Sequence, residues 1–135
     1  MGISQIRVKT SKREEIIDIT DKIYQIVKDS KVENGLCRVF VPHTTAGITI
    51  NENADRNVKI DFINILKKLI PQSREYLHVE GNSDSHVKAS LVGFSQTILI
   101  QNKKFLLGTW QGLMFCEFDG PRTRKVIISL EGISS

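Results

Sequence analysis

Three histidines lie in polar connections of the chain rather than within apolar runs: His43, His78 and His86. An imidazole titrates near neutral pH, so each could act as a general acid or base. Three imidazoles brought together could instead hold a divalent metal ion and leave one position open for water or substrate. The sequence contains neither a His-x-x-x-His nor a Cys-x-x-Cys spacing, and a single exposed loop histidine is more often a residue without function.

A carboxylate interrupts the apolar run of residues 113–118 at Glu117. Burying it is costly unless it is paired, and Arg122 or Arg124 is the obvious partner. A structural ion pair and a functional acid with a raised pKa both fit this pattern. The basic residues Arg122, Arg124 and Lys125 could bind phosphate, or they could protect an exposed edge strand by their charge.

A second polar group stands at the start of an expected helix, where Asn51, Glu52, Asn53 and Asp55 follow one another closely. Acidic and Asn residues suit a helix N-terminus, and Asn53 alone could cap it. Glu52 and Asp55 would then be available as ligands of a metal ion or of a substrate amine. The pattern leaves capping and ligand binding equally open.

The only tryptophan of the chain is flanked by glycines in Gly108-Thr109-Trp110-Gln111-Gly112. Two glycines around three larger residues indicate a backbone held close to another group, with polar side chains presented there. Thr109 and Gln111 are the better candidates for ligand contacts. Trp110 could instead pack in the core or in a subunit interface.

The composition is that of a globular protein, and we expect a single domain over residues 1–135. Of the 135 residues, 40% are hydrophobic and 25% are charged. No apolar run reaches the roughly 20 residues needed to span a bilayer, and no signal peptide is evident, so we expect a cytoplasmic protein without a membrane partner. The net charge of +4 comes from scattered residues, which fits a small anionic ligand and disfavours nucleic acid. Cys37 and Cys116 lie in apolar runs and are expected to be buried free thiols.

The order of elements predicts an α+β fold with mostly antiparallel sheets. Helices are expected over residues 20–30, capped by Thr20 or Asp21, and over residues 54–70, while residues 72–90 look irregular. Residues 46–50 are expected to pair with residues 36–41 across a polar bend, and Asn102-Lys103 to form a tight hairpin turn. The other expected strands are residues 6–8, 15–18, 91–94, 96–101, 104–108, 112–118 and 124–131.

Three segments resemble the signatures of the YjbQ-like proteins, an uncharacterised protein family. They are residues 43–52 (His-Thr-Thr-Ala-Gly-Ile-Thr-Ile-Asn-Glu), the stretch from Ser90 through Gly93 to the Gly-Thr-Trp-Gln-Gly motif, and residues 116–122. The resemblance covers nearly the whole chain. It implies two sheets packed as a β-sandwich with two helices, and a homotrimer.

The resemblance also implies an activity, because some members are linked to thiamine-phosphate synthesis, which joins a pyrimidine pyrophosphate to a thiazole phosphate. The residues and the resemblance together predict the site in three parts. The expected catalytic residues are His43, Glu52 and Glu117. The expected substrate-binding residues are Thr44, Asn51, Asp55, Thr109, Gln111 and Arg122. The expected ligands of a divalent metal, zinc or magnesium, are His43, His78 and His86.

Two hypotheses follow from this set of residues. In the first, the protein is an enzyme of the thiamine-phosphate synthase type, and its basic residues hold a phosphate or pyrophosphate. In the second, the same pocket belongs to a non-catalytic trimeric module that binds a metal or a phosphorylated metabolite. The chain lacks an Asp-rich pyrophosphate motif, so the sequence leaves both hypotheses open.

Overall fold

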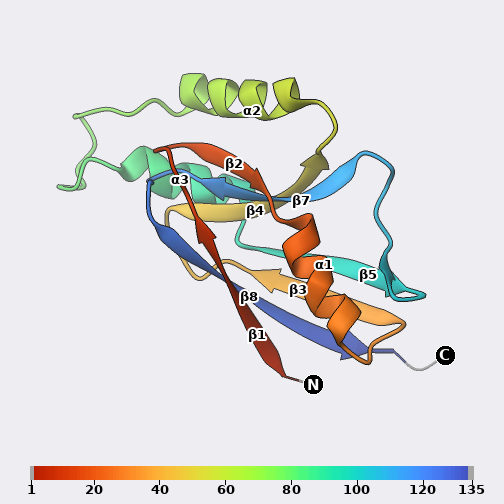
Figure 1. Cartoon of the computed structure of the whole chain (residues 1–135). Helices are drawn as coiled ribbons and strands as arrows, with labels where there is room; N and C mark the ends of the chain where they lie inside the picture. The colour runs from red at the N-terminus through yellow and green to blue at the C-terminus, as the bar shows by residue number, and fades with distance from the viewer. Residues whose placement is uncertain (1, 134–135) are drawn as a thin grey trace.

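A computed structural model describes residues 2–133 and shows two antiparallel sheets (Figure 1). The larger sheet has the strand order β1-β8-β3-β5-β6 and the smaller one β2-β7-β4. The strands are β1 (Ile3–Lys9), β2 (Glu15–Asp18), β3 (Gly35–Phe40), β4 (Ala46–Glu52), β5 (Ser95–Gln101), β6 (Lys104–Phe105), β7 (Gln111–Glu117) and β8 (Thr123–Gly132). The helices are α1 (Thr20–Asp29), α2 (Arg56–Leu69) and α3 (Ser83–Val92). The predicted α+β class with two mostly antiparallel sheets is confirmed.

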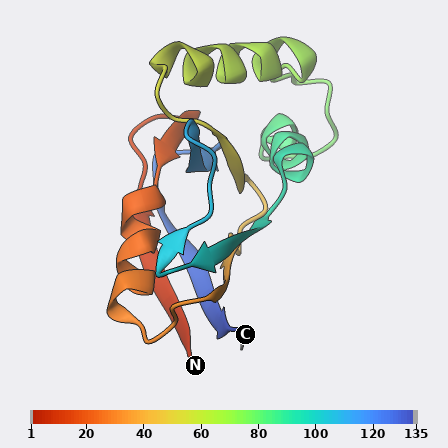
Figure 2. The ribbon, with the colours of Figure 1, turned by 90° about the vertical axis from the view of Figure 1, so that its right-hand side faces the viewer.

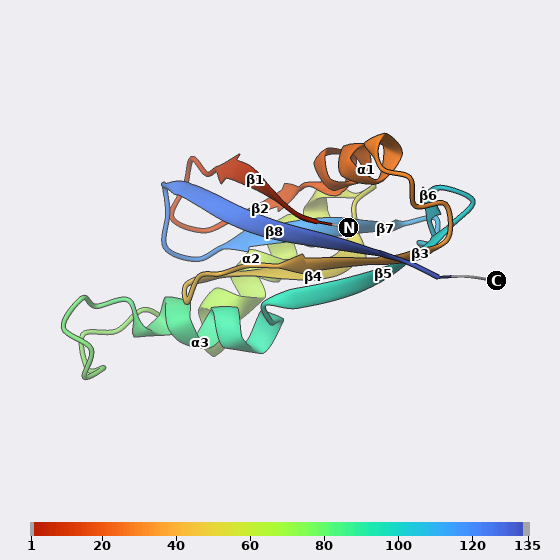
Figure 3. The same ribbon diagram turned by 90° about the horizontal axis from the view of Figure 1, so that it is seen from below.

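The main core lies between the two sheets and α1. Alternate residues of β8 and β3 point into this core from the larger sheet. In the smaller sheet, consecutive residues of β7 are buried, because the larger sheet covers one face of β7 and helices α2 and α3 cover the other. Figure 2 shows α2 above the smaller sheet, and Figure 3 shows α1 and α3 on opposite sides of the molecule. The fully buried residues of this core include Val39, Val126 and Ile128 from the larger sheet, Ile48 and Phe115 from the smaller sheet, and Ile23 and Val27 from α1.

The two cysteines are buried free thiols, as predicted. Cys37 and Cys116 have no exposed surface and form no disulfide. Burial raises the pKa of each thiol to about 12, because the thiolate would lose its hydration. Neither thiol is therefore suited to act as a nucleophile or metal ligand.

The two predicted helices are present, but other residues cap them. Thr20 is the first residue of α1 rather than its cap, and it donates its N–H to the carboxylate of Asp18 at 2.9 Å. Helix α2 is capped by Asp55, which accepts the N–H of Asn57 at 2.9 Å. The prediction that Asn53 caps this helix was wrong, because its side-chain amide donates to the carboxylate of Asp18 instead.

A third helix, α3, replaces part of the segment predicted to be irregular and the strand predicted over residues 91–94. It ends at Gly93, whose φ of 98° is readily adopted only by glycine. The buried residues of α3 are Asp84, Ser85, Lys88 and Ala89. Because three of these four are polar, the buried face carries no hydrophobic pattern in the sequence, which is why the helix was missed.

The predicted pairing of residues 46–50 with residues 36–41 was wrong. Strand β3 pairs with β5 and β8 in the larger sheet, whereas β4 pairs with β7 in the smaller one. Residues 42–45 therefore carry the chain from one sheet to the other. The predicted turn at Asn102 and Lys103 is confirmed, with φ values of 51° and 62° that suit a tight hairpin.

Candidate functional site

An open hollow of about 540 Å³ lies where the chain crosses between the two sheets. Its volume falls in the range of pockets that bind small organic molecules. The crossing segment is fixed at both ends: Val41 donates its N–H to Phe94 O at 2.8 Å, and Thr45 O accepts the N–H of Phe118 at 3.1 Å. The polar residues that line the hollow are His43, Thr44, Thr45, Arg122 and Arg124.

A buried ion pair between Glu117 and Arg124 supports the hollow from within the fold. Glu117 has no exposed surface, and Arg124 Nε lies 2.9 and 3.1 Å from its two carboxylate oxygens. The Thr10 hydroxyl, at 2.9 Å, and the Asp119 N–H, at 3.1 Å, also donate to Glu117. Arg124 Nη2 donates further to the Thr45 hydroxyl at 2.8 Å. Since the oxygens of Glu117 are satisfied internally, the geometry favours the ion pair over a catalytic acid.

Two arginines line the hollow. Arg124 lines the hollow but is only 2% exposed, and its Nε and Nη2 are already paired with Glu117 and Thr45. Arg122 donates through Nε to Asp119 O at 2.9 Å and through Nη2 to the Asp119 carboxylate at 3.0 Å. A guanidinium has five N–H donors, and the half-exposed Arg122 uses only Nε and Nη2, so Arg122 keeps donors available for an anion.

The imidazole of His43 is held in one tautomer. Its Nε2 accepts the backbone N–H of Lys125 at 2.9 Å, so in the neutral ring the proton resides on Nδ1. Partial burial lowers the pKa of His43, and the positive charge of Arg124 lowers it further. His43 is therefore a neutral hydrogen-bond donor at physiological pH, and its one basic nitrogen is already occupied.

The other two histidines contact each other near the N-terminus of α3. The rings of His78 and His86 are 5.3 Å apart between centroids and meet edge to face, and Glu80 lies 3.9 Å from His78 Nε2. In the part of the chain that the structure describes, no three His, Cys, Asp or Glu side chains are arranged to share a metal ion. A three-histidine metal site therefore does not fit a single chain, and a metal at this pair would need a ligand from elsewhere.

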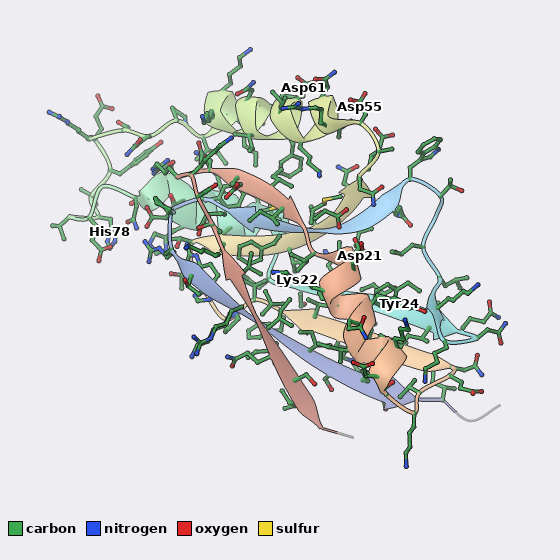
Figure 4. The ribbon with its side chains drawn as sticks, viewed as in Figure 1. Asp21, Lys22, Tyr24, Asp55, Asp61 and His78 are labelled. Carbon is green, nitrogen blue, oxygen red and sulfur yellow. The ribbon has the colours of Figure 1, made fainter. Side chains whose placement is uncertain are left out.

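The remaining predicted site residues lie at the far end of the smaller sheet. In the β4–β7 ladder Ala46 pairs with Glu117 beside the hollow, whereas Glu52 pairs with Gln111 at the other end. Seven residues of strand separate the two ends by about 20 Å. Figure 4 labels Asp55 at the start of α2 and His78 on the opposite side of the view, before α3.

This far end contains Asn51, Glu52, Asp55, Thr109 and Gln111. Gln111 Oε1 accepts the N–H of Gly108 at 2.8 Å, so the Gln111 side chain is hydrogen-bonded within the loop of residues 108–111. Asp55 serves as the cap of α2. The polar residues predicted to form one pocket thus form three groups within one chain: those at the hollow, the His78–His86 pair, which does not line the hollow, and those at the far end of the smaller sheet.

Several structurally important residues were missing from the predicted site. Phe40 and Phe94 line the hollow, and no chemical motif marks them in the sequence. A buried charge cluster joins Lys88 to Glu14 at 2.7 Å and to Asp84 at 2.8 Å. The i, i+4 spacing of Asp84 and Lys88 was a signal for this cluster, but only if the segment had been recognised as a helix.

The fold and site together define a small two-sheet α+β protein with an arginine-lined hollow at the crossing between its sheets. The family profile described as "UPF0047 protein YjbQ-like" matches residues 4–133, and the chain belongs to this family. No helix within residues 2–133 is long and apolar enough to cross a membrane.

Relatives match along almost their whole length. A UPF0047 protein of Methanocaldococcus jannaschii is 57% identical over 126 residues, which cover 93% of this chain and 91% of the relative. YugU of Bacillus subtilis, also a UPF0047 protein, is 45% identical over 131 residues, covering 96% and 99%. The crystal structure of a Clostridium acetobutylicum YjbQ/UPF0047 protein superposes with a TM-score of 0.93 at 52% identity, covering 95% of this chain and 99% of that one.

Proposed function

We propose that the hollow at His43 binds the phosphate or pyrophosphate group of a small metabolite. One observation carries this proposal: the guanidinium groups of Arg122 and Arg124 line the hollow together with His43, whose Nε2 accepts the Lys125 N–H and so leaves the ring proton on Nδ1. Charge-assisted hydrogen bonds from guanidinium groups are the strongest that a protein offers to phosphate. None of the lining residues is an Asp or Glu that would repel the anion.

The geometry at His43 bears on the kind of chemistry that such a site performs. Its basic nitrogen accepts the Lys125 N–H, so His43 stabilises negative charge and does not abstract a proton. A displacement in which pyrophosphate leaves needs this kind of electrostatic help. We therefore propose a transferase of the thiamine-phosphate synthase type, in which the thiazole nitrogen attacks the pyrimidine methylene carbon and the carbon–oxygen bond to pyrophosphate breaks.

The second candidate is a non-catalytic module that binds a phosphorylated metabolite in the same hollow. The absence of a free basic nitrogen on His43 is compatible with this function as well. A turnover assay separates the two candidates: release of pyrophosphate from a mixture of the pyrimidine pyrophosphate and the thiazole phosphate identifies the transferase. Binding of pyrophosphate without any turnover would identify the module.

The polar group at the far end of the smaller sheet could join the same site only from another copy of the chain. The homotrimer implied by the family resemblance would allow this arrangement. Asn51, Thr109 and Gln111 would then contact the organic part of the substrate rather than its phosphate, because they bring no positive charge.

Replacing Arg122 by alanine is expected to weaken pyrophosphate binding about 10- to 100-fold, as charge-assisted hydrogen bonds contribute roughly 1.5–3 kcal/mol. Isothermal titration calorimetry with inorganic pyrophosphate measures the change. Arg38→Ala is the matched control, because Arg38 is similarly exposed and also pairs with a carboxylate, that of Glu131, but does not line the hollow. Equal binding by Arg122→Ala and the natural chain would contradict the proposal.

A further inference from the structure

The hollow at His43 has an apolar wall beside its cationic groups. Phe40, Val41, Pro42 and Phe94 form this wall. Phe40 is the last residue of β3 and remains 46% exposed, and it does not belong to the core between the sheets. An aromatic side chain that the core does not use, in a hollow that Arg122 and Arg124 also line, is suited to contact a ligand.

Building on the proposed phosphate site, we propose that this wall binds a flat apolar ring, so that the hollow selects phosphate esters of ring compounds over those of sugars. The phosphate would lie against Arg122 and Arg124, and the ring against Phe40 and Phe94. Phe40 and Phe94 are then the residues that determine specificity.

The size of the hollow favours an organic phosphate over the inorganic ion. A volume of about 540 Å³ is far larger than one phosphate group requires. Pockets of this size typically combine a mainly apolar lining with a few polar groups that fix the orientation of the ligand. The arginines supply the polar anchor, and the wall leaves room for one ring.

The hydrogen-bonding character of the lining argues against a sugar. Hydroxyl groups of a sugar need acceptors, and none of the residues that line the hollow is an Asp or Glu. The Thr45 carbonyl already accepts from Phe118, and the Thr45 hydroxyl accepts from Arg124. In this open hollow the hydroxyl groups of a sugar would stay bonded to water and gain little from the apolar wall, whereas an aromatic ring gains apolar contact with Phe40 and Phe94.

The test compares three probes on the full chain by isothermal titration calorimetry: phenyl phosphate, glycerol 3-phosphate and inorganic phosphate. The natural chain is expected to bind phenyl phosphate about 10-fold more tightly than glycerol 3-phosphate, because an aromatic contact adds free energy of that order. Phe40→Leu is expected to remove most of this preference while leaving the affinity for inorganic phosphate unchanged. The half-exposed position of Phe40 makes this variant compatible with the fold.

Leu99→Ala is the matched control, since Leu99 is an equally exposed apolar residue of the same sheet that does not line the hollow. It should retain the full preference for phenyl phosphate. The ring-binding wall would be overturned, and the phosphate site left intact, if the natural chain bound the two esters with equal affinity. The same conclusion would follow if Phe40→Leu lowered the affinity for both esters by the same factor. Failure of all three probes to bind would overturn the phosphate site itself, and the wall with it.

Discussion

Replacing Glu117 by alanine is expected to lower the free energy of unfolding by about 3–5 kcal/mol, the usual cost of removing one partner of a buried ion pair. Arg124 would remain almost fully enclosed, with only 2% of its surface exposed and without its counter-charge. The Thr10 hydroxyl and the Asp119 N–H would also lose their acceptor. Urea denaturation followed by circular dichroism measures the change.

The matched control is Glu131→Ala, which breaks another Glu–Arg pair in the same molecule. Glu131 pairs with Arg38 at 2.8 Å, but both side chains are about half exposed. Exposed pairs contribute roughly 0–1 kcal/mol, so this variant should lose little stability. Similar small losses in both variants would show that the Glu117–Arg124 pair does not stabilise the crossing between the sheets.

The second large effect is expected from Lys88→Ala. Lys88 is 1% exposed, and its ammonium group donates to Glu14 at 2.7 Å and to Asp84 at 2.8 Å. Hydrogen bonds from Arg13 and Lys88 lower the pKa of Asp84 despite its burial, so the cluster depends on both cations. Removing Lys88 leaves a cavity and two poorly compensated carboxylates, and we expect a loss of about 3–5 kcal/mol in unfolding free energy.

Lys67→Ala is the control for this cluster, because Lys67 approaches the same Glu14 at 3.5 Å from a side chain that is 55% exposed. Lys67→Ala should lower the free energy of unfolding by less than about 1 kcal/mol. Hydrogen exchange of the α3 amides adds a local measure, since Lys88→Ala should speed exchange there first. If Lys88→Ala unfolds at the same urea concentration as Lys67→Ala, the cluster does not anchor α3.

The elements that the sequence predicted well are those whose buried faces are apolar. Helix α2 repeats Val58, Phe62 and Leu66 at helical spacing, and the structure places these residues toward the smaller sheet. Helix α3 was missed because the residues that it buries are mainly charged or small. Its stability comes from ion pairs with Arg13 and Glu14, which are distant in sequence and leave no local pattern.

The site was predictable only in part. A carboxylate inside an apolar run requires a partner, so the pairing of Glu117 with Arg124 could be anticipated. The separation of His43 from Gln111 could not be anticipated from the sequence, because it depends on which strands pair. Residues 42–45 pass from one sheet to the other instead of closing a hairpin, and this crossing places the two polar groups at opposite ends of β4.

The central claim is that the hollow at His43, and not the Gly-Thr-Trp-Gln-Gly loop, binds phosphate groups. Titrating inorganic pyrophosphate into isotope-labelled protein and following its NMR spectrum tests this claim most directly. We expect saturable shifts of the His43 imidazole and the Thr44 amide, with no change in the indole of Trp110. Shifts at Trp110 and Gln111 with none at His43 would contradict the account.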